Sequence, residues 1–174
     1  MDHHEMIALI RPAVPGDGGT WADLGAGTGN FTRALGKLLG PHGTIYAVER
    51  AAFQNPPRSF DDVAGTIHWM TADFSLPMNL PTLDGLLMAN ALHFIRDQAA
   101  VLGHVCEYLR PDGRFVLVEY DVQRPLAHIP HPVPFQRCIS LAREAGLVSP
   151  ARIGERHSPS TGIVMYSAIA LKPR

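Results

Sequence analysis

Short apolar runs typical of strands alternate along the chain with segments in which apolar residues recur every three or four positions, as in helices. Strands are expected at 21–24, 44–48, 67–71, 84–88 and 114–120, and helices at 30–39, 98–109 and 135–145. Helical crossovers build parallel sheets that are covered on both faces. Together with two further apolar runs near the C-terminus, at 151–155 and 162–171, the pattern therefore predicts a doubly wound, three-layer α/β/α fold with a mostly parallel seven-stranded sheet.

The C-terminal third departs from this alternation. Residues 123–134 contain four prolines and no periodicity, which predicts a loop or an open lid. Two apolar runs, 151–155 and 162–171, follow without an intervening helix, so they should pair as an antiparallel C-terminal hairpin. We expect residues 1–174 to form a single domain, because one core of this length is common.

Composition narrows the classes of partner. Fifteen Lys and Arg against sixteen Asp and Glu give a net charge of −1, without the basic surface that nucleic-acid binding favours. No apolar run is long enough for a membrane span, and the start, with His3 and His4 at an end expected to fray, is unlike a secretory signal. A cytoplasmic protein with two reduced cysteines is expected. The nine histidines have no metal-ligand spacing, so no metal site is expected.

A glycine-rich turn, Asp23-Leu24-Gly25-Ala26-Gly27-Thr28-Gly29-Asn30, joins the first strand to the first helix. Glycines there permit positive φ and let a ligand approach the backbone closely. The spacing G-x-G-x-G differs from the G-x-G-x-x-G of dinucleotide binders. Asp23 would repel a pyrophosphate but attract the ammonium group of a methionine moiety, which favours S-adenosylmethionine as the ligand.

This turn resembles motif I of the class I S-adenosylmethionine-dependent methyltransferases. Residues 83–94 resemble motif IV of the small-molecule enzymes of that family, and 109–114 resemble the loop before its fifth strand. The resemblance implies that Glu49 accepts hydrogen bonds from the ribose hydroxyls and that Asp73, with Phe74, reads adenine. The cofactor-binding residues that it implies are Asp23, Gly25, Ala26, Gly27, Gly29, Asn30, Phe31, Glu49, Arg50, Asp73, Phe74, Asn90 and Ala91.

Each acidic residue also has a purely structural alternative. Asp23 could cap the following turn, Glu49 could pair with Arg50 or a lysine, and Asp73 could be a helix N-cap. Asn55-Pro56-Pro57 looks like the N-P-P core of amino-methyltransferases, but it follows the second strand rather than the fourth and is interpreted as a loop.

Methyl transfer from a sulfonium needs alignment of the acceptor and exclusion of water, whereas a base is needed only for some acceptors. His93, just beyond the fourth strand, is the candidate catalytic base, and its alternative is a histidine packed under the loop. Glu119, Tyr120, His128 and His131 are candidates for substrate contact.

Three departures from the family pattern concern substrate enclosure: a short N-terminal segment with little lid, prolines that shorten or displace the helix expected within 51–63, and an aromatic content of only 7%. A methyltransferase acting on a small molecule is the favoured function. The alternatives are an enzyme acting on a protein or nucleic acid, a cofactor-binding module completed by a partner or a second copy in a homodimer, and a nicotinamide enzyme.

Overall fold

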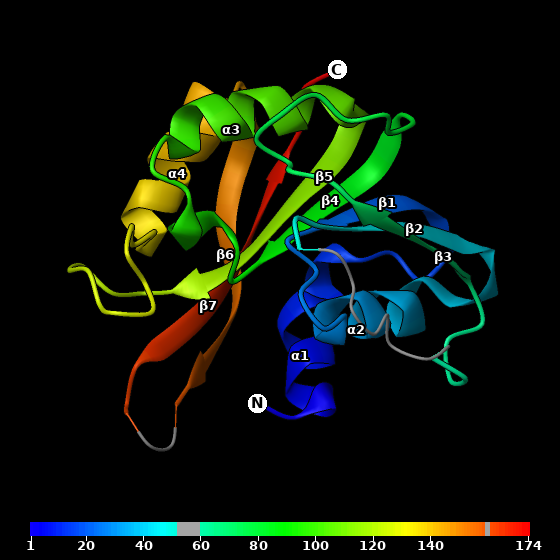
Figure 1. Ribbon diagram of the computed structural model, residues 1–174, viewed down its shortest axis with the longest axis horizontal. Coiled ribbons are helices and arrows are strands. Elements are labelled where there is room, and N and C mark those ends of the chain that lie inside the picture. The colour runs from blue at the N-terminus through cyan, green and yellow to red at the C-terminus, as the bar shows by residue number, and fades with distance from the viewer. Residues whose placement is uncertain (52–59, 159–160) are drawn as a thin grey trace.

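The strands of the chain form one seven-stranded sheet in the order β3-β2-β1-β4-β5-β7-β6, in a computed structural model that describes residues 1–51, 60–158 and 161–174 (Figure 1). The five strands β1 to β5 are parallel, and β7 is antiparallel to both β5 and β6. The predicted fold class is therefore confirmed, including the C-terminal hairpin. The strands are β1 (Gly19–Leu24), β2 (Gly43–Glu49), β3 (Thr66–Thr71), β4 (Leu83–Ala89), β5 (Leu109–Tyr120), β6 (Val148–His157) and β7 (Val164–Leu171).

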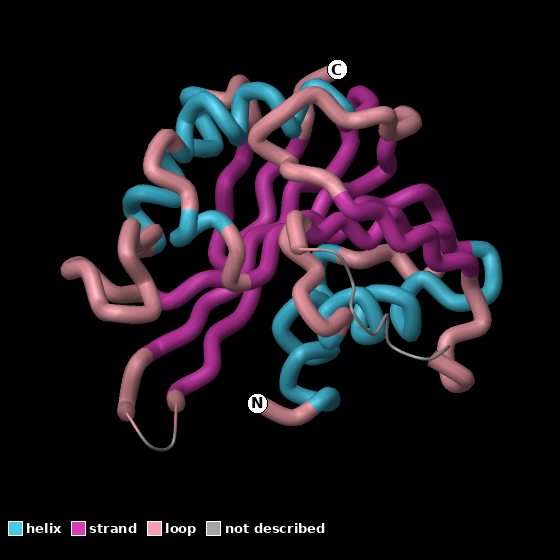
Figure 2. The backbone as a smooth tube through the Cα atoms, viewed as in Figure 1, coloured by secondary structure: helices cyan, strands magenta, loops and turns pink. Residues whose placement is uncertain are grey.

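Helices cover both faces of the sheet (Figure 2). On one face lie α1 (His3–Ile10) and α2 (Asn30–Leu39), and on the other α3 (Gln98–Val105) and α4 (Phe135–Glu144). The alternation of side chains along β5 shows why both are needed, since Phe115 and Leu117 pack in the core beneath α3 and α4, whereas Val116 packs in the core beneath α1 and α2. Short 3-10 turns occupy Arg11–Ala13, Gly40–His42, Leu92–Phe94 and Cys106–Tyr108.

The N-terminal residues fold into α1, so the expectation that His3 and His4 fray is wrong. Asp2 and Glu5 form a capping box, in which the Asp2 Oδ1 atom accepts from the Glu5 backbone N–H at 2.9 Å and the Glu5 Oε2 atom accepts from the Asp2 N–H at 2.8 Å. The other end is tied to the sheet, because the Ser167 hydroxyl donates to the Leu9 carbonyl at 2.6 Å. The N-terminal segment, which was expected to provide little lid, therefore forms a helix that packs on one face of the sheet.

Two boundaries near β5 differ from the prediction. The helix expected at 98–109 ends at Val105, and Leu109 already belongs to β5. The turn expected at 110–113 lies inside this strand as an irregularity in its pairing with β4, with Asp112 at a φ of 60°. The helix expected within 51–63 falls mainly on residues 52–59, and Asn55-Pro56-Pro57 falls there entirely, outside the described residues.

The segment 123–134 is a loop, as predicted, but it is not open. Ile129 and Val133 are completely buried, and the His131 backbone N–H donates to the His93 carbonyl at 3.0 Å. Its prolines prevent regular structure, while these contacts fix it over the end of β4. The loop therefore forms a fixed wall beside the strand ends.

Candidate cofactor and acceptor site

The glycine turn after β1 has the backbone geometry that only glycine adopts readily. Gly25, Gly27 and Gly29 all have positive φ, at 78°, 55° and 81°. The Gly25 N–H donates to the Val48 carbonyl at 2.9 Å, which fixes the turn to the end of β2. A Cβ atom on Gly25 would lie 2.5 Å from that of Ala91, whereas one on Gly27 would enter open space. That open space beside Gly27 is where a ligand can approach the backbone.

Two cavities adjoin this turn and share Gly25, Gly27 and Asn90. The larger one, of about 410 Å³, extends toward the ends of β2 and β3, and the smaller one, of about 250 Å³, extends toward α1. Every predicted cofactor-binding residue except Gly29 lines one of the two. They gather because the carboxyl ends of parallel strands share one edge of the sheet, where ligands of open α/β sheets bind.

Asp23 carries an unpaired oxygen into the smaller cavity. Its side chain is 1% exposed, and the Thr32 hydroxyl donates to Oδ2 at 2.6 Å, but Oδ1 has no hydrogen-bond partner among the described residues. Burial raises the pKa of Asp23 to about 6, and the charge of Glu49 adds to the rise. Asn90 Oδ1, in the wall of both cavities, is also buried and unpartnered. Two such acceptors fit a cationic donor, such as an ammonium group, and Asp23 does not cap the turn.

Glu49 fixes the turn and still has room to bind a ligand. Its Oε2 accepts from the Gly27 N–H at 2.9 Å, and its Oε1 accepts from the N–H groups of Arg50 and Ala51 at 2.8 and 3.3 Å. The structure shows no ion pair between its carboxylate and the Arg50 side chain in the described residues. Oε2 retains a second acceptor position, and the residue lines the larger cavity.

Asp73 shapes a turn beside the same cavity. Its Oδ1 accepts from the Ser75 N–H at 2.9 Å and from the Ser75 hydroxyl at 2.6 Å, and these bonds lower the pKa of Asp73. No helix of the described residues begins here, so the N-cap alternative is wrong. Oδ2 remains available to a ligand, and both Asp73 and Phe74 line the larger cavity.

His93 is packed, as its structural alternative required, and it is paired with a buried acid. Its side chain is 3% exposed, its Nδ1 lies 2.7 Å from Glu119 Oε2, and its backbone N–H donates to Glu119 Oε1 at 3.1 Å. Nε2 has no partner in the described residues and is not among the buried unpartnered atoms, so it retains contact with solvent. The next two residues, Phe94 and Ile95, line the larger cavity.

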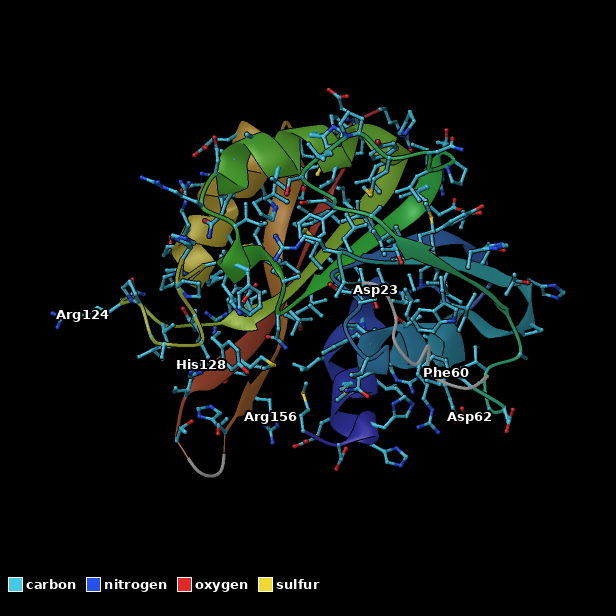
Figure 3. All side chains as sticks on the ribbon, in the orientation of Figure 1. Asp23, Phe60, Asp62, Arg124, His128 and Arg156 are labelled. Carbon is cyan, nitrogen blue, oxygen red and sulfur yellow. The ribbon has the colours of Figure 1, made fainter. Side chains whose placement is uncertain are left out.

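The other candidates for substrate contact differ in their burial and in their position relative to His93. Glu119 is 0% exposed and held by His93, so the expectation that it contacts substrate is wrong; an acid directly after the apolar run Phe115 to Val118 was the signal that it needed a buried partner. Tyr120 places its ring 6.1 Å from those of both His93 and His128. His128 lies on the loop that follows β5 (Figure 3), and His131 holds that loop through its backbone.

A family model described as a methyltransferase domain matches residues 2–149. A reducing polyketide synthase from a Penicillium species is 30% identical over 106 residues, which are 56% of this chain and 4% of the synthase. The ubiquinone/menaquinone biosynthesis C-methyltransferase of Saccharophagus degradans is 26% identical over 103 residues, which are 56% of this chain and 41% of that protein. The chain thus spans less than half the length of these curated relatives.

Among solved structures, the 1,6-didemethyltoxoflavin-N1-methyltransferase of Burkholderia thailandensis, with bound 1,6-didemethyltoxoflavin and S-adenosylhomocysteine, superposes with a TM-score of 0.76 at 20% identity. The match covers 99% of this chain and 78% of that one. At this identity the likeness concerns the fold, and it extends to the N-terminal helix and the C-terminal hairpin.

Proposed function

Since the chain belongs to the methyltransferase-domain family, we propose that it binds S-adenosylmethionine in the two joined cavities and methylates a small molecule. The observation that carries the proposal is the buried, unpartnered Asp23 oxygen beside an open glycine turn, because a cationic ligand group at that place would stabilise it. In this placement Asp23 and Asn90 hold the amino acid end, Glu49 holds the ribose, and Asp73 with Phe74 holds adenine. When bound, the cofactor supplies an electrophilic methyl group.

His93 is proposed to take a proton from the acceptor. Glu119 holds Nδ1 at 2.7 Å, so Nε2 is left as the nitrogen that can accept a proton. One relative is a C-methyltransferase and another a polyketide synthase, which supports an acidic carbon as the methylated atom. Because Met6 of α1 and Met1, just before that helix, lie in the wall of the smaller cavity, the alternative of a protein or nucleic-acid substrate loses the open front that favoured it.

The protein is further proposed to act in the cytoplasm. Among the described residues no helix combines the length and the apolar character that crossing a membrane requires. Cys106 and Cys138 are both buried free thiols, which supports a reducing compartment such as the cytoplasm. A single domain and a homodimer stay predictions, and light scattering would measure the second.

Isothermal titration calorimetry tests cofactor binding. S-adenosylmethionine and S-adenosylhomocysteine should bind with micromolar affinity, whereas NAD should not bind. Glu49→Ala should weaken both adenosyl ligands about 100-fold, because it removes the proposed ribose acceptor and the support of Gly27. Glu49→Gln, which keeps one acceptor oxygen, should lose less. Binding of NAD, or no binding of the adenosyl ligands, would contradict the proposal.

Replacing His93 by alanine should leave the affinity for S-adenosylhomocysteine within about twofold and lower kcat by about 100-fold or more, the usual contribution of a general base. Glu119→Gln should lower kcat less, because the amide still contacts the ring but no longer stabilises its protonated form. His42→Ala, which removes an exposed ring just before β2, at the end of that strand opposite Glu49, is the matched control. Full turnover by His93→Ala would assign His93 a packing role only.

A further inference from the structure

Arg156 lies at the edge of the sheet where β5 ends, although it comes from the distant hairpin. It faces Met165 across the β6–β7 pair, and Met165 faces Tyr120 across the β5–β7 pair. Directly opposed residues of antiparallel strands share a face, so Tyr120, Met165 and Arg156 form a row on the side of the sheet that α1 covers. Figure 3 shows Arg156 between the hairpin and α1.

Only part of the guanidinium of Arg156 is used within the chain. Its Nε donates to Glu5 Oε1 of α1 at 2.9 Å, while Nη1 and Nη2 have no partner among the described residues. The side chain is 19% exposed. The same helix carries Met6, in the wall of the cavity that holds Asp23. Arg156 is thus held against the helix that carries Met6, with both Nη nitrogens, and so four N–H donors, unused by the described residues.

A second unused group lies nearby. The Tyr120 hydroxyl has no partner in the described part of the chain, and the Tyr120 ring is 6.1 Å from the ring of His93. Burial raises the pKa of Tyr120 and the charge of Glu119 adds to the rise, whereas the charge of Arg156 opposes it, as expected for a cation close to this hydroxyl. The Tyr120 hydroxyl is therefore an unused group beside the proposed base, and Arg156 lies in the same row of the sheet, two strands away.

We propose that Arg156, together with Tyr120, binds the carbonyl oxygen of an enolisable acceptor such as a β-dicarbonyl compound, an inference that rests on the proposed methyltransferase function. The acidic carbon–hydrogen bond breaks, the proton passes to His93 Nε2, and the electron pair moves to the oxygen as an enolate. The guanidinium stabilises that charge before the pair forms the new carbon–carbon bond to the methyl group, whose bond to sulfur breaks and leaves its electron pair on the thioether product. The proton leaves His93 for solvent.

The competing explanation is that Arg156 only fastens α1 to the hairpin. Arg156→Gln and Glu5→Gln both remove this ion pair, and Gln at position 5 is compatible with the capping box. A purely mechanical role predicts the same effect for both variants. Oxygen binding predicts that only Arg156→Gln has a large effect, because Glu5→Gln keeps the guanidinium.

Acetylacetone, a neutral β-diketone whose enolate has its own ultraviolet band, serves as the probe. It is titrated with pH against protein saturated with S-adenosylhomocysteine, and binding of that ligand is first measured in every variant. The unaltered protein and Glu5→Gln should lower the pKa of the bound diketone by at least about one unit. Arg156→Gln should abolish this shift and lower kcat for the diketone about 100-fold while its KM changes less, because the guanidinium stabilises charge that develops during the reaction.

Equal behaviour of Arg156→Gln and Glu5→Gln would overturn the inference in favour of a clamp. So would the absence of bound enolate in unaltered protein that does bind S-adenosylhomocysteine. Failure of the unaltered protein to bind S-adenosylhomocysteine would instead overturn the proposed function, and the inference with it. Circular dichroism and thermal melting confirm that each variant is folded.

Discussion

Replacing Gly27 by valine is expected to weaken the binding of S-adenosylmethionine at least 100-fold, on the order of a loss of 3 kcal/mol, in a protein that still folds. The Cβ atom at this position would enter the open space between the two cavities, so a branched side chain would occupy the volume proposed for the ligand. The φ of 55° also strains a β-branched residue by about 1–3 kcal/mol, which a typical domain survives.

Gly146→Val is the matched control for this strain. Gly146, just after α4, has a φ of 75° and likewise nothing within 4 Å of an added Cβ atom, but it lies in neither cavity. Both variants should melt at similar temperatures, and only Gly27→Val should lose binding in calorimetry. Retained affinity in Gly27→Val would show that the glycine turn does not contact the ligand.

The parallel part of the sheet could be predicted because each of its central strands is buried on both faces. Such strands read as uninterrupted apolar runs, as in β4, where Leu86, Leu87 and Met88 are all fully buried. The residues of the glycine turn, Glu49 and Asp73 could then be placed together, since all follow the carboxyl ends of neighbouring parallel strands.

Neither the formation of α1 nor the packing of the loop 123–134 against the rest of the fold could be predicted in the same way. An eight-residue helix gives little periodicity, and its formation depends on the Asp2–Glu5 cap and on contacts with β6 and β7 far away in sequence. The loop has the prolines of an open segment, and only the fold shows that its own residues Ile129 and Val133 are buried.

The positions of Glu119 and Arg156, two side chains near the proposed base, could not be predicted from the sequence either. The pairing of Glu119 with His93 joins β5 to the turn that follows β4, and its geometry depends on the register between β4 and β5. Arg156 lies level with Tyr120 only because two antiparallel registers in succession relate β6 to β5. Sequence spacing carries no information about such registers when no periodic pattern links the residues.

Asp23→Asn is expected to weaken the binding of S-adenosylhomocysteine about 10- to 100-fold at pH 8 and, at the same pH, to stabilise the ligand-free protein. Burial raises the pKa of Asp23 from 3.8 to about 6, so the ionised carboxylate costs the folded state about 3 kcal/mol above pH 6. The stability that Asp23 contributes therefore falls as the pH rises from about 4 to about 6 and is constant above that. An ammonium ligand restores it by pairing with Oδ1.

The two effects of this substitution have opposite signs, which separates a binding role from a structural one. Affinity in the unaltered protein should rise with pH through about 6, because the ligand favours the ionised carboxylate, and the asparagine variant should lack this rise. Its melting temperature at pH 8 should increase by about 3 °C, part of the gain being lost because the new amide also lacks a partner. Asp84→Asn, in the neighbouring strand but bonded to Thr20 and Arg110 at the opposite edge of the sheet, should leave affinity unchanged and lower stability slightly. If Asp23→Asn instead destabilised the ligand-free protein and bound the ligand normally, the unpaired oxygen would serve the fold, and the cationic end of the cofactor would have to bind elsewhere.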